Sequence, residues 1–255
     1  MFSLYNLNIL SDKQALSGLP EGKLLINTIN AHSYNVAQED ALFAEALQNG
    51  DVLTPDGASI VHACRYLHTP SQPRERVAGW DVFIYEMTAL EKRAEATNTH
   101  PVVFFMGSSP DVLQRITERA ALDFPYLKIV TYSPPYKPEF TTDEDAAIVR
   151  AINSAHPDLL WIGMTAPKQE KWTYTHWQQL DIHCHVGTIG AVFDFYAGTA
   201  KRAPLWWQRH SLEWLYRLIK EPRRMWRRYI IGNALFIRNV LREKSENGCR
   251  NTNAG

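Results

Sequence analysis

The chain has 255 residues, 45% of them hydrophobic, and its 27 basic residues balance its 27 acidic residues. It is long enough to bury a complete core and falls between the usual one-domain and two-domain sizes. The neutral total hides an asymmetry, because lysine and arginine crowd residues 201–250 while the preceding part is correspondingly acidic. A basic end this localised indicates an anionic partner.

The three cysteines, Cys64, Cys184 and Cys249, are widely spaced and form no CxxC pattern, so they imply neither a disulfide framework nor a zinc site. The first residues lack the basic start and apolar stretch of a signal peptide. No uncharged run reaches the roughly 18 residues expected of a membrane-spanning helix. We therefore expect a protein of the reducing cytoplasm without a membrane span.

Short apolar or β-branched runs alternate with longer amphipathic stretches, which is typical of parallel strands joined by helices. Strands are predicted at 23–27, 101–107, 127–132, 158–164 and 183–188. Helices are predicted at 82–97, 111–123, 143–155 and 168–180. Ser109-Pro110 is expected to start the second of these helices and Thr142 the third. The pattern predicts an α/β fold with a mostly parallel sheet.

The composition changes after Gly198, where tryptophans appear among many arginines. Two or three helices are predicted there, with a break near Pro222 because proline cannot continue a helix. We expect a core at residues 1–198, a basic, tryptophan-rich helical appendage at 199–244 and a disordered polar tail at 245–255. The appendage is either a solvated basic face or a surface for anionic lipid headgroups and a diphosphate. No nucleic-acid partner is expected, because the chain is neutral and carries no recognised reader motif.

Ligands of open parallel sheets bind where the carboxyl ends of the strands open into loops. Candidates there are Thr28, Asn30 and residues 54–57, 107–110 and 163–169. Asp56 precedes a glycine at the start of a helical stretch, so its carboxylate either caps the helix or projects into a cleft as a base. The local pattern leaves both interpretations open.

Several other patterns carry less information. The GSSP turn at 107–110 fits a phosphate or a plain tight turn, and neither GxGxxG nor a P-loop is present. Asp143-Glu144-Asp145 matches a metal-binding Asp-x-Asp pair, but acidic residues are also expected in the first turn of a helix. His183 and His185 share one face of a predicted strand without a third ligand nearby. We therefore expect neither a metal nor a cofactor.

Four segments together resemble one known family. They are RERVAGWD (74–81), APKQE (166–170), GAVFDFYAG (190–198) and KRAPLWWQRHSLEWLYRLIKEPRRMWRRY (201–229). In this order they resemble the WecG/TagA/CpsF glycosyltransferases, and the resemblance runs from about residue 24 to residue 241. It implies a Rossmann-like core with a C-terminal helical appendage that docks on the membrane and helps to close the active site.

The resemblance also implies an activity. Members are inverting, do not require metal, and move a hexose or N-acetylhexosamine-type sugar from a UDP-sugar to a polyprenyl-diphosphate-linked acceptor in bacterial surface polysaccharide or teichoic acid synthesis. This chain would work at the inner face of the cell membrane, against an anionic surface. The donor sugar, the acceptor, the polymer and formation of a homo-oligomer are left open.

By resemblance, Asp56 would be the general base, and the other residues would contact substrate. Thr28 and Asn30 would line the sugar pocket, Arg76 and Gln169 would contact substrate, Asp194 would contact the nucleotide, and Arg217, Arg224 and Arg227 would reach its diphosphate.

The chain departs from the family pattern at two positions. Thr165 and Thr188 stand where the family usually has glycine, close to the expected pocket.

Two other functions are considered. A nucleotide-dependent oxidoreductase would need a dinucleotide fingerprint that is not found. A non-catalytic scaffold recruited to the membrane would not be stabilised by UDP.

Overall fold

The computed structural model describes residues 2–204, 206–207 and 212–252, without the side chains of Arg217, Arg224, Arg228 and residues 247–252. Within this part, six strands form one sheet in the order β2-β1-β6-β5-β3-β4, and each neighbouring pair is parallel. The strands are β1 (Leu24–Ile29), β2 (Val52–Pro55), β3 (Val102–Gly107), β4 (Lys128–Tyr132), β5 (Leu159–Gly163) and β6 (His185–Thr188). This confirms the predicted α/β fold with a parallel sheet.

The central strands β3 and β5 are apolar along their whole length because helices cover both faces of the sheet. All residues of β5 are buried, and so are all residues of β2. The five predicted strands are present. The sixth, β2, was not predicted, because its run is short and contains a proline. Pro55 is tolerated there since β2 lies at the edge of the sheet.

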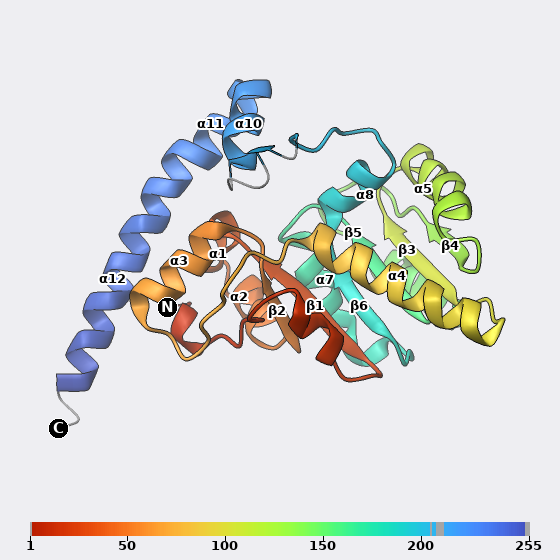
Figure 1. Ribbon diagram of the computed structural model, residues 1–255, viewed down its shortest axis with the longest axis horizontal. Helices are drawn as coiled ribbons and strands as arrows, with labels where there is room; N and C mark the ends of the chain where they lie inside the picture. Colours follow the sequence, from red (N-terminus) through yellow and green to blue (C-terminus); the bar gives the residue numbers. More distant parts are fainter. Residues whose placement is uncertain (1, 205, 208–211, 253–255) are drawn as a thin grey trace.

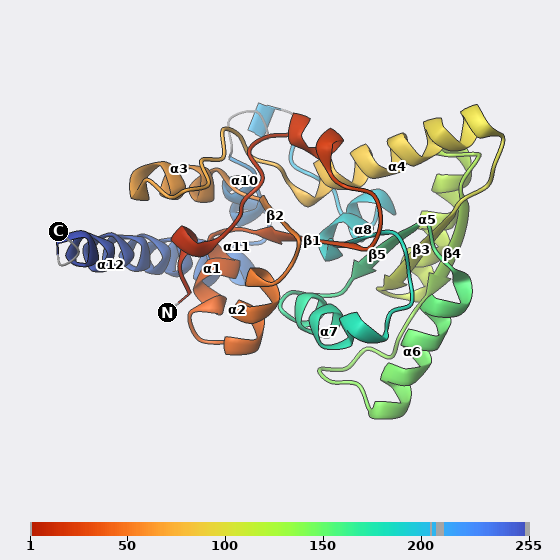
Figure 2. The ribbon, with the colours of Figure 1, turned by 90° about the horizontal axis from the view of Figure 1, so that it is seen from below.

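Two layers of helices enclose the sheet, as Figure 2 shows. One face packs against α4, α5 and α8, and the other against α1, α2, α6 and α7. The helices of the core are α1 (Ala31–Ala37), α2 (Ala41–Gln48), α3 (Ala58–Leu67), α4 (Gly79–Thr97), α5 (Pro110–Asp123), α6 (Thr142–Ala155), α7 (Lys168–His176) and α8 (Gly190–Tyr196). Short helical turns are η1 (Leu4–Asn6), η2 (Gln14–Gly18) and η3 (Trp177–Gln179).

Two helix starts follow the sequence closely. Ser109 caps α5 by accepting a hydrogen bond from the N–H of Val112 (3.3 Å), and Pro110 occupies the first turn, as predicted. Helix α6 begins with a capping box in which Thr141 and Glu144 bond each other's backbone N–H. The cap is therefore one residue before the predicted Thr142.

The C-terminal part consists of α10 (Glu213–Lys220), α11 (Pro222–Trp226), the π-helical turn η4 (Arg227–Ile231) and α12 (Gly232–Thr252). The predicted break at Pro222 separates α10 from α11. Figure 1 shows α10 and α11 at the top of the molecule, while α12 runs down one side past α1 and α3.

Helix α12 shares a hydrophobic core with the N-terminal residues. Phe236 and Val240 are buried in the same cluster as Phe2 and Leu4. The ring of Tyr34 packs edge-on against that of Phe236 at 5.3 Å. The helix continues to Thr252, so it includes most of the segment predicted as a polar tail. The proposed domain boundaries at residues 198 and 244 remain predictions.

Candidate active site

The chain leaves the neighbouring strands β1 and β6 in opposite directions. Helix α1 follows β1 on one face of the sheet, and α8 follows β6 on the other. The carboxyl ends of two such strands form a topological switch point, where open α/β sheets bind ligands. Thr28 and Asn30 lie at this point, at the end of β1.

Asn30 is held in a fixed orientation by the helix that follows it. Its Oδ1 accepts hydrogen bonds from the backbone N–H groups of His32 (3.0 Å) and Ser33 (3.1 Å), which caps α1. No side chain or carbonyl in the described part of the chain accepts from its Nδ2. Thr28 is partly exposed and pairs in register with Thr54 of β2. Both predicted pocket residues therefore lie at the switch point.

Asp56 directly follows β2 and is partly exposed. Its N–H donates to the carbonyl oxygen of Ile29 at 2.8 Å, so the residue is fixed beside the end of β1. The N-cap position of α3 is occupied by Gly57. One of the two predictions for Asp56 was that it caps this helix, but Gly57 holds the cap position. Asp56 lies next to Thr28 and Asn30 at the strand ends.

Arg76 lies beside Asp56 on the loop before α4. The N–H of Val77 donates to the carbonyl oxygen of Pro55 (3.0 Å), which aligns the two loops. The Arg76 guanidinium forms an ion pair with Glu213 of α10. Burial alone would lower the pKa of Arg76, but Glu213 and then Asp56 and Asp81 raise it above its ordinary value. Arg76 therefore stays charged and links the core to α10.

Glu213 also contacts a second arginine. Nη2 of Arg202 lies 3.4 Å from Oε1 of Glu213. The Arg202 guanidinium stacks over the ring of Trp80, with its centre 5.0 Å from the ring. One carboxylate thus joins two arginines that are far apart in the sequence. Neither Glu213 nor Arg202 was predicted as a site residue, although both lie in the 201–229 segment.

Comparison with known proteins identifies the family. The sequence pattern described as the glycosyl transferase WecG/TagA/CpsF family matches residues 7–250. The chain belongs to this family. It is similar to an N-acetylglucosaminyldiphosphoundecaprenol N-acetyl-beta-D-mannosaminyltransferase of Bacillus subtilis, with 29% identity over 220 residues, 86% of this chain and 80% of that protein. A protein of the same name from Bacillus spizizenii is 30% identical over 194 residues, covering 76% of this chain and 70% of its own length.

Gln169 of the APKQE motif of this WecG/TagA/CpsF chain is buried. Its Oε1 accepts from the N–H of Met164 (3.1 Å) and of Gly190 (3.0 Å), so it joins the loops after β5 and β6. Its Nε2 donates to Oε1 of the neighbouring Glu170 at 2.9 Å. Burial raises the pKa of Glu170 to about 7. Gln169 therefore connects the loops after β5 and β6, and its predicted contact with substrate remains a prediction.

The other predicted substrate contacts lie on α8 and the appendage. Asp194 is exposed on α8, and its carbonyl oxygen accepts from the N–H of Ala200 at 3.1 Å. Arg227 is exposed, and its guanidinium lies 5.4 Å from the ring centre of Trp226. The side chains of Arg217 and Arg224 lie outside the described part of the structure. Their backbones belong to α10 and α11.

Thr188 and Thr165, which depart from the WecG/TagA/CpsF pattern, differ in burial. Thr188 is fully buried, and its hydroxyl donates to Oδ1 of Asn27 (2.8 Å). Nδ2 of Asn27 in turn donates to the carbonyl oxygen of Ala46 (3.1 Å). Thr188 therefore stabilises packing between β6, β1 and α2. Thr165 is exposed in the loop before α7, where it is accessible to a ligand.

Three residues of the Asp-x-Asp and histidine patterns form contacts within the protein. Glu144 belongs to the α6 capping box, and Asp145 accepts a hydrogen bond from the indole of Trp172 (2.8 Å). His185 contacts Glu86, and this hydrogen bond raises the pKa of His185. Among the described residues, no three His, Cys, Asp or Glu side chains gather as metal ligands.

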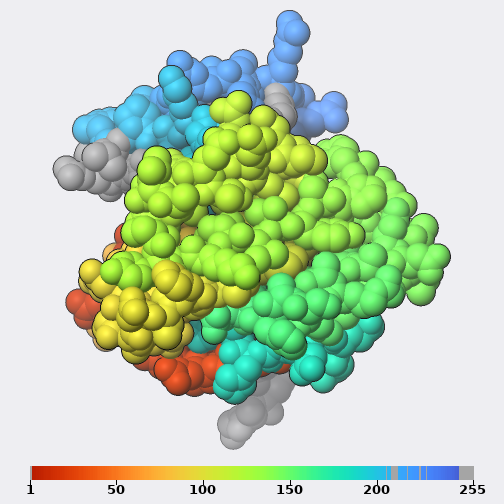
Figure 3. Space-filling view, turned by 90° about the vertical axis from the view of Figure 1, so that its right-hand side faces the viewer, coloured from red at the N-terminus to blue at the C-terminus, as the bar shows by residue number. Residues whose placement is uncertain are grey.

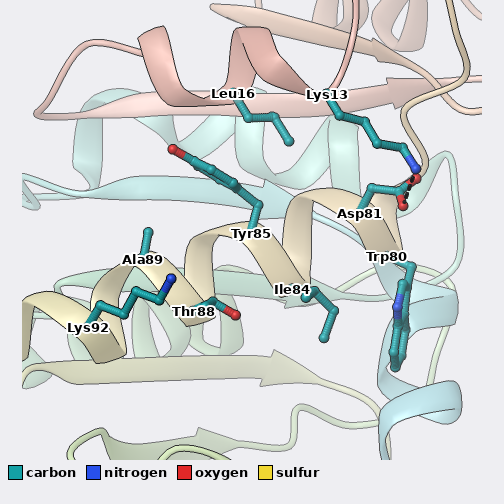
Figure 4. A pocket seen from close by; sticks show the side chains of 9 residues that line it. All are labelled: Lys13, Leu16, Trp80, Asp81, Ile84, Tyr85, Thr88, Ala89 and Lys92. Carbon is teal, nitrogen blue, oxygen red and sulfur yellow. Dashed lines mark ion pairs between the residues drawn. The ribbon is translucent and has the colours of Figure 1, made fainter.

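A pocket of about 480 Å³ lies along the outer side of α4, under the turn η2. Figure 4 shows Leu16 and Tyr85 among its lining residues and the ion pair between Lys13 and Asp81 at one end. None of the residues predicted to bind substrate lines this pocket. It is therefore separate from the strand-end site.

Proposed function

We propose that this protein is an inverting glycosyltransferase that moves a sugar from a UDP-sugar to a polyprenyl-diphosphate-linked acceptor. Membership of the WecG/TagA/CpsF family and the names of the two Bacillus relatives support this proposal. The main structural support is that Asp56 lies beside Arg76 at the switch point. Glu213 pairs with Arg76 and so attaches α10 to the same place.

In the proposed reaction, a hydroxyl oxygen of the acceptor bonds to the anomeric carbon of the donor as the bond from that carbon to the UDP oxygen breaks. Asp56 takes the proton of the attacking hydroxyl, and UDP leaves with the bonding electrons. Inversion follows because the acceptor attacks from the face opposite the leaving group. A positioned carboxylate is suited to the proton transfer.

The departing diphosphate gains negative charge, which cations near the site must stabilise. We propose that arginine supplies this stabilisation without a metal ion. Arginine suits the task because its planar guanidinium can contact two phosphate oxygens at once. Arg76 is already fixed at the site, and α10, α11 and η4 carry Arg217, Arg224 and Arg227 close in sequence.

We further propose that the appendage lies on the membrane, where a lipid-linked acceptor is found. Large apolar side chains are exposed there, including Trp214, Ile219, Trp226 and Ile230. Lys220 and Arg223 are exposed among them, a mixture that favours an anionic lipid surface. Figure 3 shows the described residues of the appendage, in blue, along the top of the molecule. Among the described helices, none has the length and hydropathy needed to cross a bilayer.

Incubation of the purified protein with a panel of UDP-sugars and a short-chain GlcNAc-diphospho-lipid tests the proposal. We expect one donor to give a product heavier by one sugar residue, with UDP released in equal amount. UDP-N-acetylmannosamine is the first donor to test, because both relatives are named for transfer of that sugar. If no UDP-sugar is consumed and UDP gives no thermal stabilisation, the scaffold alternative is favoured instead.

A further inference from the structure

Arg202 is a confined cation in the connection between α8 and α10. Its side chain is only 17% exposed. The guanidinium carbon lies 5.0 Å from the ring centre of Trp80 and 5.9 Å from that of Phe195. Two aromatic rings therefore restrict the position of the guanidinium, which lowers the entropy that a ligand contact would cost.

The hydrogen bonding of Arg202 is incomplete. Its Nε–H is buried and has no acceptor among the described residues. Its contact with Glu213, at 3.4 Å, is longer than the roughly 2.7–3.2 Å of an ordinary N–H···O hydrogen bond. A buried donor on a charged group is costly to leave unpaired. Arg202 is thus a cation with a donor, its Nε–H, that has no acceptor among the described residues.

The position of Arg202 connects it to the proposed reaction. Glu213 contacts both Arg202 and Arg76, and Arg76 interacts electrostatically with Asp56. Among the described residues, Glu213 is the carboxylate that contacts Arg202, and it is shared with Arg76. A phosphate oxygen of the substrate would give Arg202 an acceptor of its own.

We infer that Arg202 is a substrate-binding residue that donates hydrogen bonds to a diphosphate, and that Glu213 is the positioning residue that holds Arg202 and Arg76 together. This inference rests on the proposed function, in which both substrates carry a diphosphate. The donor and the acceptor present the same chemistry, so the test treats them separately.

Titration calorimetry on the full-length protein tests the inference with three probes: UDP, uridine and a short-chain GlcNAc-diphospho-lipid. Arg202→Gln is expected to weaken binding of UDP or of the lipid by roughly 10- to 100-fold, the usual range for a hydrogen bond to a charged group. Binding of uridine, which has no phosphate, should not change. Arg202→Lys keeps the charge but loses the Nε donor, and a smaller loss is expected.

Glu213→Gln tests the positioning role. It is expected to weaken binding of the same probe several-fold while leaving the affinity for uridine unchanged. The control is Arg119→Gln on α5, because Arg119 also stacks on an aromatic ring, that of Tyr196 at 4.6 Å, and pairs with Asp123. This control should bind every probe like the original protein.

The outcomes separate the inference from the proposed function. If the unmodified protein binds neither UDP nor the lipid, the proposed function fails. If it binds them and Arg202→Gln and Arg202→Lys bind equally well, the role of Arg202 is rejected. An equal loss for UDP and uridine would also reject it, since that would indicate a general structural effect. Tighter binding by Glu213→Gln would show that Glu213 competes with the diphosphate and would reject its positioning role.

Discussion

Asp56 and Arg76 lie side by side because the residues next to them share a backbone hydrogen bond, from the N–H of Val77 to the carbonyl oxygen of Pro55 at 3.0 Å. The end of β2 and the loop before α4 are thereby joined. A carboxylate suited to accept a proton lies near a guanidinium suited to stabilise a leaving phosphate. The backbone fixes this relationship before any substrate binds.

Asp56→Asn should lower turnover by about two orders of magnitude or more, because an amide cannot accept the proton of the attacking hydroxyl. The affinity for UDP should change little, since the variant keeps the shape of the side chain. Steady-state kinetics with the best donor and titration with UDP measure the two effects. Asp111→Asn, an exposed residue of α5 that pairs with Arg115, is the control. Near-normal turnover of Asp56→Asn would reject Asp56 as the base.

The position of the candidate site, at the carboxyl ends of the strands, could be predicted from the sequence. Thr28, Asn30 and Asp56 were placed at the ends of predicted strands or in adjoining turns, and parallel strands bring such ends to one edge of a sheet. The strand β2 itself was missed. Its four residues are defined by pairing with β1 and by the bridge from Ile9 to Leu53, which local sequence does not reveal.

Long-range ion pairs could not be predicted from the sequence either. Arg76 and Glu213 are 137 positions apart, and no spacing rule connects residues at such a distance. The motifs also do not show which way a polar side chain points. Gln169 was predicted to contact substrate from the APKQE motif, yet its side chain bonds to Met164, Glu170 and Gly190.

Glu170→Gln should remove a pH dependence of stability. The pKa of Glu170 is about 7 in the folded protein, against an ordinary value of 4.5. The folded state binds this proton more tightly, so its contribution to stability is fully present below about pH 4.5 and is lost as the pH rises to about 7. The loss amounts to about 3 kcal/mol. Glutamine stays neutral, so the variant should gain stability relative to the original protein between pH 5 and pH 7.5.

Urea unfolding of both proteins across this pH range measures the difference. Glu118→Gln is the matched control, because Glu118 also accepts from a glutamine, Gln114, at 2.9 Å but lies on the exposed surface of α5. It should follow the original protein at every pH. Parallel stability curves for Glu170→Gln and the original protein would contradict an elevated pKa for Glu170.

Tyr34→Phe should loosen the attachment of α12. The Tyr34 hydroxyl donates to Oε2 of Glu243 at 2.6 Å in a buried setting. Burial and then this hydrogen bond raise the pKa of Tyr34, so the hydroxyl remains a donor. Its removal leaves a buried carboxylate short of a partner and should cost about 1.5–3 kcal/mol of unfolding free energy.

The control for this prediction is Tyr66→Phe. Tyr66 is exposed and contacts α12 through Lys244, whose Nζ lies 3.7 Å from the ring centre. The phenylalanine keeps that ring, so the change in stability should stay within about 0.5 kcal/mol. Urea unfolding gives both values. Equal stability of the two variants would show that the Tyr34 to Glu243 hydrogen bond adds nothing to the docking of α12.

Ile219→Asp should weaken binding to anionic vesicles at least about tenfold, because it removes an apolar side chain from the proposed membrane surface and adds a repelled charge. Ile219 is 60% exposed on α10, beside the cationic Lys220. Leu122→Asp makes the same change in charge at an 84% exposed residue of α5, outside the appendage. Co-sedimentation with phosphatidylglycerol vesicles compares the variants. If Leu122→Asp loses as much binding as Ile219→Asp, net charge controls the association and α10 is not the contact surface.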